Sequence, residues 1–145
     1  MQTFLPYPEF PDTAICLDMR RLGKQRVETL QILNTLANGS KAWRNHPAVL
    51  MWKGYERYLV NYGLNICIEW SRRGYVDNCG IKLCDKEEEM DRNNIPLIAP
   101  PWLRNEELHS SHRAALLYKN YDFYSQWGWI EEPKLNYFWP TKNGF

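Results

Sequence analysis

The sequence predicts one all-α domain spanning residues 1–145, with a three-helix core between an extended N-terminal arm and an irregular, aromatic C-terminal segment. Apolar residues recur at three- and four-residue steps in three long segments, and no alternation of useful length predicts a strand. Hydrophobic residues make up 44% of the chain and charged residues 24%, so the chain can build a core. The absence of an apolar run of about 18 residues excludes a membrane-spanning helix. Because no signal-peptide pattern opens the chain, we expect a cytoplasmic protein.

The first two elements are an arm and a long helix. Three prolines among residues 1–11 predict an extended arm, because proline restricts its own backbone and that of the residue before it. A helix capped by Asp12 or Thr13 then runs to about Ala37, and Gly39 ends it.

This helix carries two unusual residues. Arg26 lies on its apolar stripe, so its charge requires either a bound anion or a buried ion pair with an acid such as Asp18 or Glu69. Gly23 in mid-helix costs about 1 kcal/mol relative to alanine and suggests the close approach of another group, or a kink. The predicted stripe consists of Ile15, Met19, Leu22, Leu30, Leu33 and Ala37.

The remaining elements follow from periodicity and end signals. A second helix covers 47–72, with proline at its first position, and a third covers 105–119, with an asparagine cap. Residues 84–92 form a short charged helix, and 121–129 form a short helix or turn packed on the core. The tail at 137–140 is too apolar to extend into solvent, so we expect it to pack against the protein.

The charge is unevenly distributed. Residues 1–73 carry ten lysines and arginines against six acidic residues, whereas residues 74–145 carry eight against eleven. The basic run at 20–26 is either an anion-binding face or a solvated helix surface. The acidic stretch at 85–91 should lie away from this basic run. An alternative is that the chain is an unrelated helical interaction domain, in which the acidic stretch would contact a partner. The four cysteines are expected to be buried, without disulfides.

The three histidines, His46, His109 and His112, are either a metal site or structural hydrogen-bonding residues. No HExxH or CxxC motif accompanies them, so we expect no metal ion and no cofactor. His46 at a helix start should be neutral, because the helix dipole disfavours its cation. Phosphate-loop and nucleophile-elbow motifs are also absent. With these motifs set aside, the segment 20–28 remains as the candidate functional segment. Its arginines can bind phosphate, and Gln25 can hydrogen-bond to a base edge or a sugar.

Several stretches together resemble the phage endonuclease V family of pyrimidine-dimer DNA glycosylases. Three of them are 36–41, 68–75 and 111–119. A bacterial and phage branch of that family is more similar still. The branch shares Arg-Leu-Gly-Lys-Gln-Arg at 21–26, His46-Pro47, Met51-Trp52, Gly54-Tyr55, Pro100-Pro101-Trp102 and Trp139-Pro140.

The resemblance implies a small all-α enzyme that bends duplex DNA, flips a nucleotide out of the stack and removes a damaged or modified pyrimidine, with or without abasic-site lyase activity. Its nucleophile would be the leading α-amine, which attacks the sugar and forms an imine. That amine belongs to Met1, or to Gln2 after unusual processing. The family's glutamate falls at Gly23 or Lys24 on an ungapped match, so Glu28, one turn along, is assigned as the acid/base.

The resemblance also implies arginines that hold phosphates and aromatic residues that fill the gap left by a flipped base. The alternative is a non-catalytic protein on the same fold, which would bind a nucleotide or modified base, for example in phage–host conflict. The predicted DNA or phosphate contacts are Arg21, Lys24, Gln25, Arg26, His46, His112 and Arg113.

Overall fold

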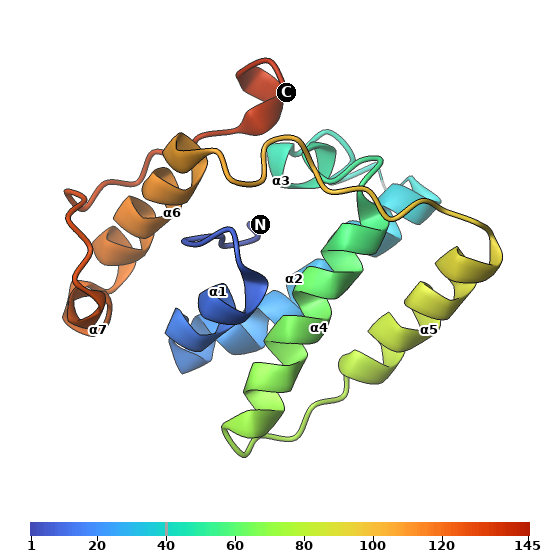
Figure 1. The fold of residues 1–145 in the computed structure, drawn as a ribbon, viewed down its shortest axis with the longest axis horizontal. Coiled ribbons are helices and arrows are strands. Elements are labelled where there is room, and N and C mark those ends of the chain that lie inside the picture. Colours follow the sequence, from blue (N-terminus) through green and yellow to red (C-terminus); the bar gives the residue numbers. More distant parts are fainter. Residues whose placement is uncertain (40) are drawn as a thin grey trace.

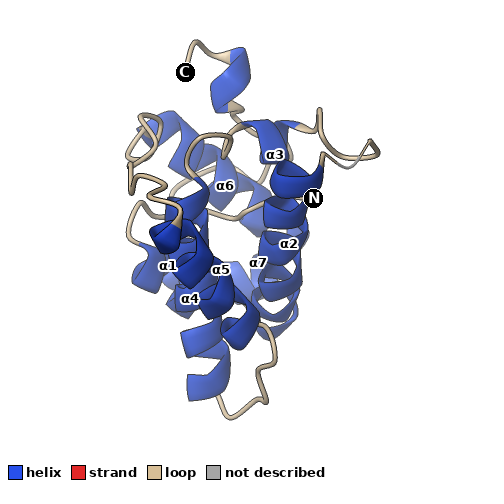
Figure 2. Cartoon of the chain, turned by 90° about the vertical axis from the view of Figure 1, so that its right-hand side faces the viewer, coloured by secondary structure: helices blue, strands red, loops and turns tan. Residues whose placement is uncertain are grey.

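The protein is described here by a computed structural model that covers residues 1–39 and 41–145. These residues form α-helices and short 3-10 helices and no strand, which confirms the all-α prediction (Figure 2). Ser40, within the stretch 36–41 that resembles the family, lies outside the described residues. No helix in the described part of the chain has both the length and the apolar character needed to cross a membrane.

The helix α4 (Glu56–Arg72) runs through the middle of the molecule (Figure 1). It packs against α1 (Phe10–Cys16), α2 (Met19–Asn38) and α5 (Gly80–Arg92). Apolar side chains from these elements are removed from water and build the core. Fully buried members are Leu22, Ile32, Leu59, Tyr62, Ile66 and Leu83, and Leu17, between α1 and α2, is buried with them.

The N-terminal residues lie between α4 and the helix α6 (Glu106–Lys119) (Figure 1). The short helix α7 (Tyr121–Tyr124) follows α6. Asn105 caps α6, as predicted, by accepting a hydrogen bond from the Leu108 amide at 3.2 Å. The aromatic tail packs against the core, also as predicted, and includes a short 3-10 helix at Pro140–Lys142.

The predicted helix at 12–37 is wrong in two respects. It begins at Phe10, after Glu9, so that neither Asp12 nor Thr13 is its cap, and it is two helices. The break falls at Asp18, whose carboxylate caps α2 by accepting from the Arg21 amide at 3.3 Å. The Tyr124 hydroxyl donates to the same carboxylate at 2.8 Å. The two helices have different directions, so the predicted stripe fails at its start: Ile15 is 48% exposed and Met19 51%. Ala37 at its far end is also exposed.

The predicted helix at 47–72 is also two helices, α3 (Pro47–Leu50) and α4. Between them Gly54 has a φ of 90°, in the left-handed region that favours glycine. This turn brings Trp52 inward, where its ring meets that of Trp102 edge to face at 4.9 Å.

The helix α5 begins at Gly80, four residues before the predicted start at Cys84. The Asp77 carboxylate accepts hydrogen bonds from the amides of Cys79, at 3.1 Å, and Gly80, at 2.9 Å, which satisfies the first turn. All four cysteines are free thiols, and three are buried as predicted, whereas Cys84 is exposed. In the acidic stretch, Glu87 pairs with Arg57 of α4 at 2.6 Å.

Candidate active site

The leading segment of the chain, residues 2–5, is held by side chains and not by a neighbouring strand. Gln25 on α2 accepts a hydrogen bond from the Phe4 amide at 3.0 Å and donates one to the Gln2 carbonyl at 2.9 Å. Tyr62 on α4 donates to the Phe4 carbonyl at 2.9 Å. Because buried backbone groups need partners, these side chains fix the path of the segment. Gln25 is only 1% exposed, so the predicted base or phosphate contact by Gln25 is replaced by this internal role.

Two histidines of α6 hold the next residue, Leu5. The Leu5 amide donates to Nδ1 of His112 at 2.8 Å, and Nδ1 of His109 lies 2.7 Å from the Leu5 carbonyl oxygen. A carbonyl oxygen only accepts, so Nδ1 of His109 carries a proton and Nδ1 of His112 does not. Burial, with a smaller contribution from His109, lowers the pKa of His112 to about 3. His112 is therefore a neutral core residue and not the DNA contact that we predicted.

The clamped segment forms one edge of a pocket with a volume of about 400 Å³. Its other walls are the first half of α2, Lys119 at the end of α6, and Leu135 and Tyr137 of the C-terminal segment. Both Met1 and Glu28 line it, and Oε2 of Glu28 lies 3.5 Å from the amide nitrogen of Gln2. The lining residues are Met1, Gln2, Phe4, Arg20, Arg21, Lys24, Gln25, Glu28, Lys119, Leu135 and Tyr137.

Four basic side chains, which we call the cationic rim, surround this pocket: Arg20, Arg21, Lys24 and Lys119. Among the described residues that line the pocket, Glu28 is the one carboxylate, and Lys24 lies 3.7 Å from it. Arg21 also pairs with Asp18, outside the lining, at 2.9 Å. Burial, and then the charges of Arg21 and Lys24, lower the pKa of Lys119, which lines the same pocket as those two cations. The pocket therefore attracts anions, phosphate included.

An aromatic row leads away from the pocket, formed by Tyr137, Trp139, His46 and Trp43. Successive ring centroids are 5.6, 6.0 and 5.8 Å apart. Trp43 at the far end is 47% exposed, so the row reaches the surface. His46 caps α3 by accepting from the Ala48 amide at 3.0 Å, and burial followed by the charge of the leading amine lowers its pKa. His46 is neutral as predicted, but the main cause is burial and not the helix dipole. It belongs to the aromatic row and does not line the pocket.

Arg26, which we predicted as a phosphate contact, lies outside the pocket. Its guanidinium pairs with Asp77 at 2.8 Å and lies 4.4 Å from the ring centre of Trp70. The buried ion pair that we considered is therefore present, but its partner is Asp77 and neither Asp18 nor Glu69. The same indole explains Gly23: an added Cβ there would come within 2.9 Å of the Trp70 ring, which confirms the predicted close approach.

Arg113, also predicted as a DNA contact, is used inside the protein. It pairs with Glu131 at 2.9 Å and with Glu106, and it donates to the Pro6 carbonyl at 2.8 Å. These bonds tie α6 to the end of the arm. Arg113 thus has its charge answered by two carboxylates and does not belong to the cationic rim.

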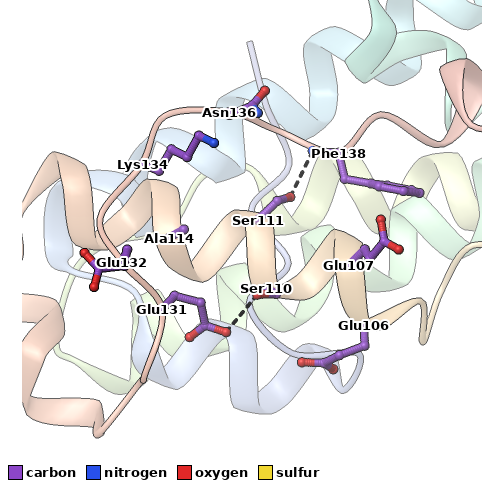
Figure 3. A pocket seen from close by; sticks show the side chains of 10 residues that line it. All are labelled: Glu106, Glu107, Ser110, Ser111, Ala114, Glu131, Glu132, Lys134, Asn136 and Phe138. Atoms are coloured by element: carbon purple, nitrogen blue, oxygen red, sulfur yellow. Dashed lines mark hydrogen bonds between the residues drawn. The ribbon is translucent and has the colours of Figure 1, made fainter.

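A second hollow, of about 580 Å³, lies between α6 and the segment 131–138 (Figure 3). It is larger than the first pocket but has the opposite charge. Ser110 donates to Glu131 at 2.9 Å within it, and Ser111 accepts from the Phe138 amide at 3.0 Å. Its acidic side chains, Glu106, Glu107, Glu131 and Glu132, outnumber its one lysine, Lys134. A DNA backbone would be repelled there, so we place the candidate site in the cationic pocket.

The structure thus brings together six predicted site residues and separates four. The pocket unites Met1, Gln2, Arg21, Lys24, Gln25 and Glu28. Outside it lie Arg26, His46, His112 and Arg113. Sequence reasoning missed Arg20, although the basic run contained it. It also missed Lys119 and Tyr137, which no sequence signal links to α2. No group of three or more histidine, cysteine or acidic side chains suited to a metal ion occurs among residues 1–39 and 41–145.

Comparison with known proteins identifies the family. Neither a curated protein nor a solved structure matches the chain. Residues 1–83 match the sequence profile of a family described as pyrimidine dimer DNA glycosylase. This match covers more than half of the chain and includes the arm, α2 and Glu28, whereas Lys119 and Tyr137 lie beyond it. The chain therefore belongs to the pyrimidine dimer DNA glycosylase family.

Proposed function

We propose that this protein is a DNA glycosylase with abasic-site lyase activity, acting on a damaged or modified pyrimidine in duplex DNA. The observation that carries the proposal is the shared pocket of Met1 and Glu28, surrounded by the cationic rim, in a chain of this family. An amine, a carboxylate and a phosphate-binding surface are the three components that amine-mediated base excision requires.

The leading amine would act as the nucleophile. α-Amines are partly neutral at cellular pH, in contrast to ordinary lysine side chains. The amine attacks C1′ of the sugar, and the bond from C1′ to the base breaks, with its electron pair leaving on the base. Loss of a proton from nitrogen and opening of the sugar ring at C1′–O4′ give an imine. In this chain the amine belongs to Met1; if Met1 is removed, the new amine lies at Gln2, 3.5 Å from Glu28.

Glu28 would act as the base. Its side chain is 10% exposed, and Oε2 accepts from Gln25 at 2.8 Å while Oε1 faces Lys24. The carboxylate removes a proton from C2′ of the imine, and the bond from C3′ to its oxygen breaks, with the electron pair leaving on the phosphate. Hydrolysis of the remaining imine then frees the protein.

The substrate would be held by two surfaces that meet at the pocket. The cationic rim binds backbone phosphates, with arginine forking two N–H groups onto one phosphate. Tyr137, the first ring of the aromatic row, lines the pocket together with Met1, and an extruded or orphaned base would stack on the rings of this row. A flipped pyrimidine nucleotide would satisfy both surfaces at once.

Borohydride trapping tests this proposal. Sodium borohydride reduces an imine to a stable amine, so the protein should form a covalent adduct with a duplex that contains one abasic site. An added Gly-Ser at the N-terminus should abolish the adduct, and Glu28→Gln should slow strand cleavage. The mass of the trapped terminal peptide identifies Met1 or Gln2 as the nucleophile.

Lys134→Ala, in the acidic hollow, is the matched control and should trap at the wild-type rate. Trapping that survives the N-terminal block would exclude the leading amine. Lys24 offers a second amine in the same pocket, and trapping that also survives Lys24→Ala would exclude that one. If the wild-type protein binds the duplex but never forms an adduct, the chain is the non-catalytic base-binding protein instead.

A further inference from the structure

Gln25 has every polar atom of its side-chain amide engaged, which is unusual for a glutamine beside a candidate site. Its Oε1 accepts from the Phe4 amide at 3.0 Å and from the Tyr62 hydroxyl at 2.7 Å. Its Nε2 donates to the Gln2 carbonyl at 2.9 Å and to Oε2 of Glu28 at 2.8 Å. One buried amide therefore contacts the leading segment twice, the central helix once and the candidate base once.

These four bonds allow only one orientation of the amide. Rotation by half a turn would place Nε2 against the Phe4 N–H, so that two donors would face each other. It would also place Oε1 against the Gln2 carbonyl and the Glu28 carboxylate, so that acceptors would face acceptors. The amide therefore always presents a donor to Glu28.

Tyr62 holds this orientation from the opposite side. It is fully buried on α4, and burial raises the pKa of its hydroxyl well above the usual value, so the group stays a donor. Its proton is shared between Oε1 of Gln25 and the Phe4 carbonyl. The central helix α4 thus holds Gln25 through Tyr62, and Gln25 in turn holds the leading segment and Glu28 at the pocket.

We propose that Gln25, oriented by Tyr62, is a positioning residue that sets the leading amine and the Glu28 carboxylate at a fixed separation. This inference rests on the proposed function, because it assumes that these two groups react with the sugar. Gln25 acts through them and does not touch the DNA. A misplacement of about 1 Å in such a pair lowers rates by about 100-fold, so the position of one amide matters.

The test compares Gln25→Met with Gln31→Met. Methionine keeps the length of the side chain but makes none of the four bonds, and Gln31 is an exposed residue of the same helix outside the pocket. In single-turnover borohydride trapping on abasic duplex DNA, Q25M should be slower by about 10- to 100-fold. Its dissociation constant for the same DNA should change by less than about threefold, because the cationic rim is intact. Q31M should match the wild-type protein in both.

The double variant Q25M/E28Q separates positioning from general structural support. The readout for this comparison is the single-turnover rate of strand cleavage, the step in which Glu28 acts. If Gln25 acts through Glu28, the double variant should lose less of this rate than the product of the two single losses. Independent, multiplicative losses would overturn the inference, and so would wild-type trapping by Q25M. If Q25M does not fold, Tyr62→Phe, which removes one hydroxyl, should still slow trapping by about 3- to 10-fold; wild-type trapping by Y62F would then overturn it. Failure of the wild-type protein to trap would instead refute the proposed function.

Discussion

Nε2 of Gln25 lies 2.8 Å from Oε2 of Glu28, one turn further along α2. This pair joins the carboxylate in the cationic pocket to the clamp on the leading segment. Both residues lie within 20–28, the basic segment for which the sequence left an anion-binding face and a solvated helix surface as alternatives. The structure divides that segment into an outer face of cations, which lines the pocket, and an inner face, which holds the arm.

Protonation of His112 should destabilise the fold in acid. The pKa of His112 falls from 6.5 to about 3 on folding, so the unfolded chain binds the additional proton first as the pH drops. Stability from this group is complete above about pH 6.5 and is lost towards pH 3, by at most about 1.4 kcal/mol per pH unit. Urea unfolding at pH 7, 6 and 5 measures the loss.

His112→Asn is the matched variant, because its amide oxygen replaces Nδ1 as the acceptor for the Leu5 N–H but does not titrate. The free energy of unfolding of H112N should depend less steeply on pH than that of the wild-type protein. Equal slopes for the two proteins would show that His112 does not govern acid stability.

Arg26 and Arg20 should respond to substitution in opposite ways. Arg26→Met leaves Asp77 without its partner in a mostly buried pair and should lower the free energy of unfolding by about 3 kcal/mol. Its DNA affinity should be unchanged when measured under conditions where it is folded. Arg20→Met, on the exposed rim, should change stability by less than about 0.5 kcal/mol but weaken DNA binding. A DNA-affinity loss in R26M equal to that in R20M would place Arg26 in the interface after all.

Gly23→Ala should destabilise the protein although alanine favours helices. The propensity gain is about 1 kcal/mol, but the new Cβ would lie 2.9 Å from the Trp70 ring. That ring is fixed by a hydrogen bond to the Val76 carbonyl and by stacking on Tyr75, so overpacking should prevail by about 1–2 kcal/mol. Thermal unfolding provides the measurement. In a Trp70→Phe background the same substitution should be neutral or stabilising, and a loss of equal size there would refute the clash.

Lys119→Ala should reduce the salt dependence of DNA binding. Each phosphate contact contributes a slope of about −0.9 to the logarithm of the binding constant against the logarithm of salt concentration. Loss of one contact from the cationic rim should therefore reduce the slope by about one, measured by fluorescence anisotropy on duplex DNA at several salt concentrations. Lys134→Ala changes the net charge equally but in the acidic hollow, so its slope should equal that of the wild-type protein. Equal effects of K119A and K134A would contradict a phosphate contact at Lys119.

Local signals in the sequence determined the fold class and most helix ends. The proline-rich arm, the glycine after α2, the proline at the start of α3 and the asparagine cap of α6 act over one turn of chain, so neighbouring residues suffice to predict them. The sequence also indicated a basic segment on the first long helix and a close approach at Gly23.

Tertiary structure alone decided the break at Asp18 and the membership of the site. Asp18 accepts a hydrogen bond from Tyr124, which is 106 residues away in the sequence. Lys119 and Tyr137 line the pocket although they come from the C-terminal part of the chain. Periodicity cannot show which segments meet, and it cannot distinguish an arginine that faces solvent from one that faces Asp77. Those outcomes depend on which buried polar groups find partners across the fold, because an unpartnered group inside the protein costs more than an imperfect helix.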